Sequence, residues 1–189
     1  MLNTYTAAIF AGGKSSRMGK DKALLPFGSY TTLSEFQQER LKPWFQKVYI
    51  SVKENKFDFT CECIVDKAPV SSPLIGLLSI LESIEEDEVF VLSVDAPFVE
   101  KGVIEKILNS DASSYDAIVA KSPSGTQPLC GLYKKSILPL VYRQLEANDH
   151  KLQSLLELAE TYYVIFNDDL PFTNLNHPHE YEKALNSLF

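Results

Sequence analysis

The sequence predicts an α/β protein built on a doubly wound, mostly parallel β-sheet of the Rossmann-like kind. Short apolar runs typical of buried strands alternate along the chain with stretches of helical periodicity. No repeat, low-complexity stretch or linker interrupts this alternation. The 189 residues are therefore expected to form one domain, residues 1–189. A composition of 45% hydrophobic and 23% charged residues is typical of globular proteins of this size.

The first half of the chain begins with an apolar strand, Thr6–Phe10, that leads into a glycine-rich segment. Thr32–Glu35 has the pattern of a capping box and predicts a helix that runs toward Gln46 with a bend at Pro43. The next expected elements are strands at Val48–Val52 and Cys63–Val65, a helix at Leu74–Ile84 and a strand at Val89–Val94.

The second half continues in the same way and ends in a helix. Its expected helices are Val103–Leu108, Ser136–Glu146, Lys151–Glu160 and Pro178–Leu188, the last one capped by Asn176 or His177. Its expected strands are Ala117–Ala120, Gln127–Tyr133 and Tyr162–Phe166. Alternating strands and helices favour parallel strands joined by crossover helices.

Composition and charge exclude several classes of function. A net charge of −7 argues against general nucleic-acid binding, and no apolar stretch reaches the roughly 20 residues that span a membrane. The N-terminus lacks the basic region and cleavage site of a signal peptide, so a cytoplasmic location is expected. Cys61, Cys63 and Cys130 lack the partners of a zinc site and are read as buried or spectator thiols.

The most informative segment runs from Phe10 to Lys22, directly after the first strand. Glycines let the backbone approach a bulky anion and point its N–H groups at it. Four of the 18 Lys and Arg residues lie between Lys14 and Lys22 in a chain that is acidic overall. The segment is not a P-loop, because no Gly-Lys-Ser/Thr sequence closes it. It is not a dinucleotide-binding turn either, because the third glycine is missing. It predicts a polyphosphate site, with a solvated surface loop as the alternative.

Two carboxylates follow apolar strands at places where such sheets bind ligands. Asp66 comes after the short strand that ends at Val65, and Asp95 comes after Val89–Val94. Asp95 is the stronger candidate for a Mg²⁺ ligand, because hard cations prefer carboxylate oxygens. A helix cap or an Asp turn is an equally good explanation of Asp95 from these residues alone.

The string FAGGKSSRMGKDKALLPFG resembles the signature loop of nucleotidyltransferases that activate a sugar or cofactor phosphate with a nucleoside triphosphate. Within that superfamily it is most similar to the molybdenum cofactor guanylyltransferases, the MobA family. Ala11-Gly12-Gly13, Arg17-Met18-Gly19 and Asp21-Lys22 stand as they do in that family, whereas the related cytidylyltransferases usually carry Ala-Ala-Gly. The resemblance implies the nucleotidyltransferase version of the doubly wound fold.

Further motifs support the resemblance and show where this chain departs from it. LSVDAPFV matches the segment that carries the family's magnesium aspartate, here Asp95. The same resemblance implies that Asp66 contacts the guanosine part of the nucleotide. After Asp66 the family has a Gly-Pro-Leu-x-Gly sequence at the start of the next helix, and Ser72 replaces the first glycine of that sequence. Ser51 replaces an asparagine after the second strand, and Phe10 replaces a leucine beside the guanine pocket.

Thr173–Pro178 resembles the Asn-x-Asn-x-Pro turn near the family's C-terminus. Such a turn caps the last helix, and its two amides, Asn174 and Asn176, are implied to reach the pterin substrate or the metal. Related cytidylyltransferases more often have Asp at these positions, so the asparagines again favour the molybdenum branch.

The resemblance implies a Mg²⁺-dependent transfer of GMP from GTP to the phosphate of molybdopterin, with release of pyrophosphate. Lys14 and Arg17 would hold the β- and γ-phosphates, Lys22 the α-phosphate, and Asp95 the metal. The implied catalytic residues are Lys22, Arg17 and Asp95. The implied nucleotide-binding residues are Phe10, Ala11, Gly12, Gly13, Lys14, Lys22, Ser51, Asp66 and Asp95. The implied partners are GTP, the molybdenum cofactor, upstream cofactor-synthesis proteins, and acceptor molybdoenzymes or their chaperones.

Two rival functions remain open at this point. One is a CTP-dependent cytidylyltransferase of the same fold that acts on molybdopterin or on a sugar or alcohol phosphate. The other is a non-catalytic nucleotide-binding regulator. Lys22 and Asp95 argue against the regulator, because a sensor does not need a metal at the α-phosphate.

Overall fold

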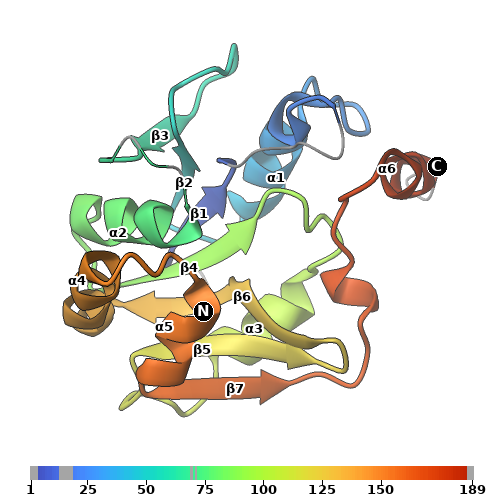
Figure 1. Cartoon of the computed structure of the whole chain (residues 1–189). Coiled ribbons are helices and arrows are strands. Elements are labelled where there is room, and N and C mark those ends of the chain that lie inside the picture. Colours follow the sequence, from blue (N-terminus) through green and yellow to red (C-terminus); the bar gives the residue numbers. More distant parts are fainter. Residues whose placement is uncertain (1–3, 13–18, 69, 71, 187–189) are drawn as a thin grey trace.

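The computed structural model describes residues 4–12, 19–68, 70 and 72–186. Within these residues one seven-stranded sheet forms the centre of the molecule (Figure 1), with the strand order β3-β2-β1-β4-β6-β5-β7. The strands are β1 (Thr6–Phe10), β2 (Lys47–Val52), β3 (Glu62–Val65), β4 (Glu88–Ser93), β5 (Ala117–Ser122), β6 (Gly125–Lys134) and β7 (Thr161–Ile165). The α/β fold class predicted from the sequence is therefore confirmed.

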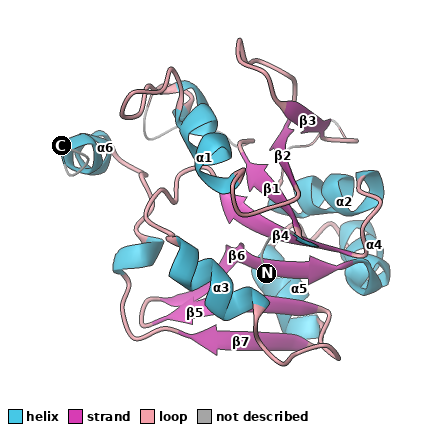
Figure 2. Ribbon diagram, turned by 180° about the vertical axis from the view of Figure 1, so that it is seen from behind, coloured by secondary structure: helices cyan, strands magenta, loops and turns pink. Residues whose placement is uncertain are grey.

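Helices cover both faces of this sheet. They are α1 (Leu33–Leu41), α2 (Pro73–Ser83), α3 (Lys101–Leu108), α4 (Leu138–Glu146), α5 (Leu152–Leu158) and α6 (Pro178–Asn186), with 3₁₀ turns η2 (Lys22–Leu24), η3 (Lys135–Ile137) and η4 (Leu170–Phe172). Helices α1 and α3 pack on one face in a first apolar core, and α2, α4 and α5 pack on the other face in a second (Figure 2). No helix in the described part of the chain is long and apolar enough to cross a membrane.

One strand departs from the parallel arrangement. β6 runs antiparallel to both of its neighbours, β4 and β5, whereas the other pairings in the sheet are parallel. The cause is the connection between β5 and β6, in which only Pro123 and Ser124 lie between the strands. A parallel crossover needs a dozen or more residues, so this two-residue connection forces a hairpin. As a result, Cys130 in the middle of β6 pairs with Leu92 near the end of β4.

The first helix is shorter than its sequence pattern suggests. Its N-terminus is as expected, because the Thr32 hydroxyl accepts a hydrogen bond from the Glu35 N–H at 3.0 Å. The helix ends at Leu41, so the predicted continuation toward Gln46 is wrong. Pro43 explains this end, because proline has no N–H to donate to the preceding turn. Because the helix ends early, strand β2 begins at Lys47.

Candidate active site

The candidate site lies at the carboxyl ends of the central strands. Ser51, Phe10 and Ser93 are neighbours in the register of β2, β1 and β4, so the chain leaves these strands at one edge of the sheet. The chain proceeds from β1 outward to β2 and β3, and then returns to place β4 on the other side of β1. Ligands of doubly wound folds bind where the strand order reverses in this way.

Three side chains from distant parts of the sequence meet at this edge. Lys22 Nζ forms an ion pair with Asp95 Oδ2 and donates a hydrogen bond of 3.0 Å to Asn176 Oδ1. The side chains of Lys22 and Asp95 are only 16% and 12% exposed. Each residue comes from a different one of the three motifs found in the sequence. The fold therefore brings the expected phosphate, metal and pterin residues into direct contact.

Local structure holds each member of this triad. Asp21 caps the 3₁₀ turn η2 by accepting a hydrogen bond from the Ala23 N–H at 3.0 Å, which sets the backbone of Lys22. The buried Leu175 donates its N–H to the carbonyl oxygen of Asp95 at 2.9 Å. The turn that carries Asn174 and Asn176 is therefore attached to the loop that carries the aspartate.

The contacts of Asp95 exclude one of the structural explanations left open by the sequence, the helix cap. Its Oδ1 accepts a hydrogen bond from the Ser93 hydroxyl at 2.5 Å, while its Oδ2 pairs with Lys22. Helix α3, the next helix along the chain, begins at Lys101 with Glu100 at its N-cap. Asp95 is therefore not a helix cap. It is a largely buried carboxylate whose charge faces a cation.

A second layer of polar contacts fixes the loop that carries Asp95. Gln37 of α1 is fully buried and donates a hydrogen bond from Nε2 to the carbonyl oxygen of Val94 at 3.0 Å. Arg40 donates to the same glutamine and, at 2.5 Å, to the carbonyl oxygen of Val99. Burial lowers the pKa of Arg40 to about 10. Both ends of segment 94–99 are thus held by α1.

Several of the predicted nucleotide-binding residues lie along the same edge of the sheet. The Ala11 N–H donates to the Ser51 carbonyl oxygen at 3.0 Å, and the Gly12 backbone lies beside Ser51 and Lys53. Asp66 follows β3 and is half-buried. Burial raises the pKa of its carboxyl group, and the charge of Lys53 opposes this rise. Gly13, Lys14 and Arg17 lie outside the described residues.

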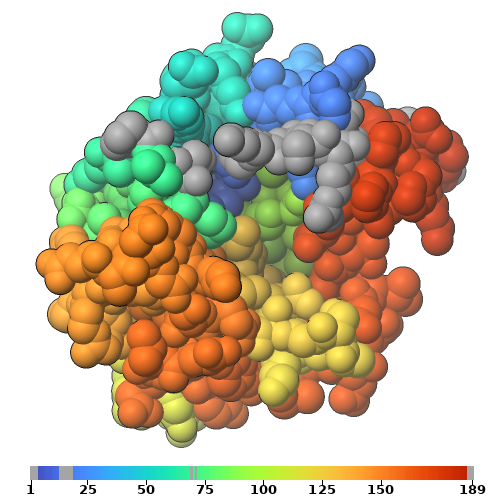
Figure 3. All heavy atoms as spheres, in the orientation of Figure 1, coloured from blue at the N-terminus to red at the C-terminus, as the bar shows by residue number. Residues whose placement is uncertain are grey.

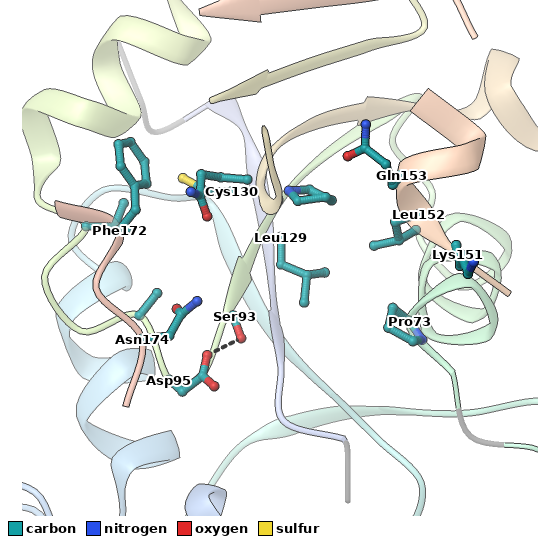
Figure 4. A pocket seen from close by; sticks show the side chains of 14 residues that line it. Pro73, Ser93, Asp95, Leu129, Cys130, Lys151, Leu152, Gln153, Phe172 and Asn174 are labelled. Atoms are coloured by element: carbon teal, nitrogen blue, oxygen red, sulfur yellow. Dashed lines mark hydrogen bonds between the residues drawn. The ribbon is translucent and has the colours of Figure 1, made fainter. Parts of the chain in front are cut away.

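A cavity of about 440 Å³ adjoins Asp95 on the side away from β2 and β3. Figure 3 shows the surface hollowed between α5, in orange, and the red C-terminal segment. In Figure 4, Asp95 and Asn174 lie on one side of the cavity, and Pro73, Lys151 and Gln153 lie on the other. The remaining lining residues are Ser93, Ala96, Val99, Gln127, Pro128, Leu129, Cys130, Leu152 and Phe172. The cavity is large enough for a heterocyclic ligand.

Comparison with known proteins shows which family the chain belongs to. Residues 7–171 match the model of the MobA-like NTP transferase domain. The chain is 40% identical to a molybdenum cofactor guanylyltransferase of Campylobacter jejuni, over 99% of this chain and 98% of the relative. A protein of the same name from Helicobacter pylori is 29% identical, over 100% and 95% of the two chains.

This chain belongs to the molybdenum cofactor guanylyltransferase family.

Solved structures show how widely the fold is shared. Molybdopterin-guanine dinucleotide biosynthesis protein A of Archaeoglobus fulgidus superposes with a TM-score of 0.83 at 21% identity, over 97% and 98% of the two chains. A 2-C-methyl-D-erythritol 4-phosphate cytidylyltransferase of Thermus thermophilus superposes with a TM-score of 0.70 at 15% identity, over 97% of this chain and 98% of that one. At these identities the likeness concerns the fold alone. The assignment to the guanylyltransferase family depends on the sequence relatives.

Helix α2 still begins at Pro73 although Ser72 replaces the family's glycine before it. The Ser72 hydroxyl caps α2 by accepting a hydrogen bond from the Ile75 N–H at 3.2 Å. It also shares a hydrogen bond of 3.0 Å with His150 Nδ1. In the same helix, Gly76 lies against Phe10 and Ser51, two of the predicted nucleotide-binding residues. Phe10 itself is buried in the core beneath α2 rather than open to the edge of the sheet.

Replacing Gly76 by alanine is expected to destabilise the protein by about 1 kcal/mol or more. A Cβ atom at this position would lie 2.8 Å from Cε1 of the buried Phe10 ring and 3.4 Å from the Ser51 hydroxyl. The control is Gly102→Ala in α3, where a Cβ meets nothing within 4 Å. Alanine is the better helix former, so that variant should gain up to about 1 kcal/mol. Urea unfolding measures the stability of both variants. Equal stabilisation by the two changes would contradict the close approach of the Phe10 ring to Gly76.

Sequence reasoning missed several residues that shape the site. Ser93 had a recognisable signal, because it ends β4 only two positions before Asp95, which places its hydroxyl near that carboxylate. Gln37 and Arg40 look like ordinary surface residues of a polar helix. Lys56, which contacts the ends of the signature segment, belongs to an irregular loop with no motif. Only the folded chain shows what the last three touch.

Proposed function

We propose that this chain transfers the GMP unit of GTP to the phosphate of molybdopterin, releasing pyrophosphate and forming the guanine dinucleotide cofactor. The contact of Lys22 with Asp95 and Asn176 carries the proposal, because it joins three family motifs in one site. Family membership supports the same activity. We place the reaction in the cytoplasm, where GTP is available.

The chemistry needs little beyond positioning and charge. An oxygen of the acceptor phosphate attacks the α-phosphorus of GTP and forms a new P–O bond. The bond from the α-phosphorus to the bridging oxygen breaks, and pyrophosphate leaves with the electron pair. The attacking oxygen is already anionic, so no general base is required. The protein contributes alignment of the two phosphates and compensation of the charge that builds up between them.

Lys22 is suited to the central role in charge compensation. It is held at the end of β4 between Asp95 and Asn176, and its ammonium group is largely shielded from water. A positive charge in such a place interacts more strongly with a phosphate than it would in bulk water. Lys14 and Arg17 are proposed to hold the β- and γ-phosphates as these become the leaving group.

The residues at this edge fit a divalent cation of the magnesium type. Asp95 offers carboxylate oxygens, and Asn174 and Asn176 offer amide oxygens nearby. Among the described residues there is no cluster of three or more histidine, cysteine or acidic ligands. Magnesium beside nucleotides needs only one or two carboxylates, because phosphates and water complete its shell. When bound, the cation supplies positive charge to the triphosphate oxygens.

The cavity beside Asp95 is proposed to receive the pterin. Pro73, Leu129 and Phe172 provide apolar walls for a flat ring system, and Gln127 and Lys151 provide polar groups for its edges. A ligand in this cavity would have its phosphate next to Lys22 and Asp95. The nucleotide would lie on the opposite side of Asp95, along the ends of β1, β2 and β3.

The direct test is a reaction with purified components. The protein, GTP and Mg²⁺ are incubated with molybdopterin, and pyrophosphate is measured together with the mass of the pterin product. Pyrophosphate release that needs both substrates, with a product heavier by one GMP unit, is expected. Release without molybdopterin would point to simple hydrolysis, and no release at all would contradict the proposal.

The choice of nucleotide is a separate prediction. The Ala11-Gly12-Gly13 sequence and the Asn174–Asn176 pair favour GTP over CTP by at least about tenfold in affinity, or roughly 1.4 kcal/mol. Calorimetric titration with each nucleotide in the presence of Mg²⁺ measures the difference. Equal or tighter binding of CTP would favour the cytidylyltransferase alternative.

A further inference from the structure

Two cysteine thiols lie in contact at the start of β3. Cys61 directly precedes this strand and Cys63 is its second residue, and their Sγ atoms are 3.5 Å apart. The contact follows from their spacing, because residues two positions apart on a strand point to the same face. Both cysteines are free and partly exposed, and not buried as one interpretation of the sequence suggested. The two thiols can therefore react both with each other and with small molecules.

The backbone at Cys61 is held in place but is not part of the sheet. In the described part of the chain β3 is an edge strand (Figure 1), and its pairing with β2 starts after Cys61. The buried Gln38 of α1 donates a hydrogen bond from Nε2 to the carbonyl oxygen of Thr60 at 3.0 Å. Cys61 is thus kept beside Cys63, yet it can shift without breaking a hydrogen bond between the strands.

The geometry of the pair suits a disulfide better than a metal ion. Two residues along a strand rise about 6.6 Å, which lies within the range of Cα separations that a disulfide spans. The sulfur atoms have to approach each other by only about 1.5 Å to reach the length of an S–S bond. A structural zinc ion needs four ligands, and the described residues contain no group of three or more histidine, cysteine or acidic side chains that could hold a metal.

We propose that Cys61 and Cys63 form a redox-active dithiol that exchanges with low-molecular-weight disulfides such as oxidised glutathione. One cysteine thiolate attacks a sulfur atom of oxidised glutathione, forms a mixed disulfide and releases one glutathione thiolate. The other cysteine attacks the protein's sulfur atom in this mixed disulfide. The Cys61–Cys63 bond forms, and the second glutathione leaves. The two cysteines are oxidised, the glutathione disulfide is reduced, and the two thiol protons pass to the released glutathione thiolates.

The surroundings of the two thiols indicate which one attacks first. Burial raises the pKa of Cys63, and the hydrogen bond with Cys61 and the charge of Cys61 raise it further. Because only a thiolate attacks a disulfide, Cys63 is a poor first nucleophile, and Cys61 takes the first step. In the mixed disulfide Cys61 carries no charge, so one cause of the raised pKa of Cys63 is removed. Cys63 is already in contact with Cys61, and a reaction within one molecule is favoured over attack by another glutathione.

The test uses the reduced full-length chain and oxidised glutathione. Thiols that stay free are alkylated, and the masses of the intact protein and of the tryptic peptide 57–67, which contains both cysteines, are measured. We expect two of the three thiols to become unavailable for alkylation, no lasting glutathione adduct, and a peptide lighter by two hydrogen atoms. Excess reduced glutathione should restore the dithiol. A lasting glutathione adduct, unreacted cysteines in this peptide, or a disulfide that resists reduced glutathione would overturn the proposal.

Single variants test the roles of the two cysteines. Cys63→Ser should stop at the mixed disulfide on Cys61, whereas Cys61→Ser should form an adduct at least about tenfold more slowly, because Cys63 is rarely a thiolate. Equal rates in the two variants would overturn the assigned order of attack. Cys130→Ser is the matched control and should behave like the wild type, because Cys130 is only 3% exposed and burial raises its pKa to about 12. None of these measurements depends on guanylyl transfer.

Discussion

Replacing Lys22 by alanine is expected to lower guanylyl transfer by about a hundredfold or more. This is the range seen when one preorganised electrostatic contact in an enzyme is removed. Lys22 is held by Asp95 and Asn176 before any substrate arrives, so its charge needs no rearrangement to act on the α-phosphate. Pyrophosphate release under saturating GTP and molybdopterin measures the loss.

A matched control separates this role from a general loss of positive charge. Lys20 belongs to the same segment but is exposed, and exposed charges are screened by salt. Lys20→Ala should keep turnover within about threefold of the wild type. The melting temperature of both variants is measured as well, because Lys22 also pairs with Asp95. A folded Lys22→Ala protein with near-normal pyrophosphate release would remove Lys22 from the chemistry and revive the interpretation of the site as a nucleotide sensor.

The sequence was a good guide to the elements but a poorer guide to their ends and directions. Apolar runs such as Val89–Val94 locate strands because a strand covered on both faces needs apolar residues throughout. An apolar run of this kind does not indicate whether a strand such as β6 is parallel or antiparallel to its neighbours. It follows from the two-residue link of Pro123 and Ser124, which is too short for a crossover. The end of α1 likewise depends on one residue, Pro43, whose effect was expected to be a bend rather than a stop.

The site shows the same division between local and long-range information. Lys22, Asp95 and Asn176 were each predicted from a motif, but their mutual contact depends on the strand order that places β4 beside β1. Gln37 and Lys56, which support them, carry no local signal, because their partners lie far away along the chain. Lys56 is 45 positions from Ala11, and Gln37 is 57 positions from Val94. A single sequence has no pattern that reports such pairs.

The change Asp95→Asn is expected to abolish guanylyl transfer while leaving the protein folded. Asparagine keeps the size of the side chain and can still accept the hydrogen bond from Ser93. It removes the charge that a hard cation requires and that Lys22 pairs with. Asp95 caps no helix, but the change removes the charge that pairs with the largely buried Lys22 ammonium, so a loss of about 1–3 kcal/mol in stability is expected.

Calorimetry with and without Mg²⁺ distinguishes a metal role from a structural one. In the wild type, the affinity for GTP should be higher when Mg²⁺ is present. Asp95→Asn should remove this increase in affinity and keep the affinity for GTP that is measured without Mg²⁺. Asp111→Asn, an exposed aspartate after α3, is the control and should behave like the wild type. If Asp95→Asn retained full activity and the Mg²⁺-dependent binding, the cation would have to be held elsewhere, and Asp95 would serve only to orient Lys22.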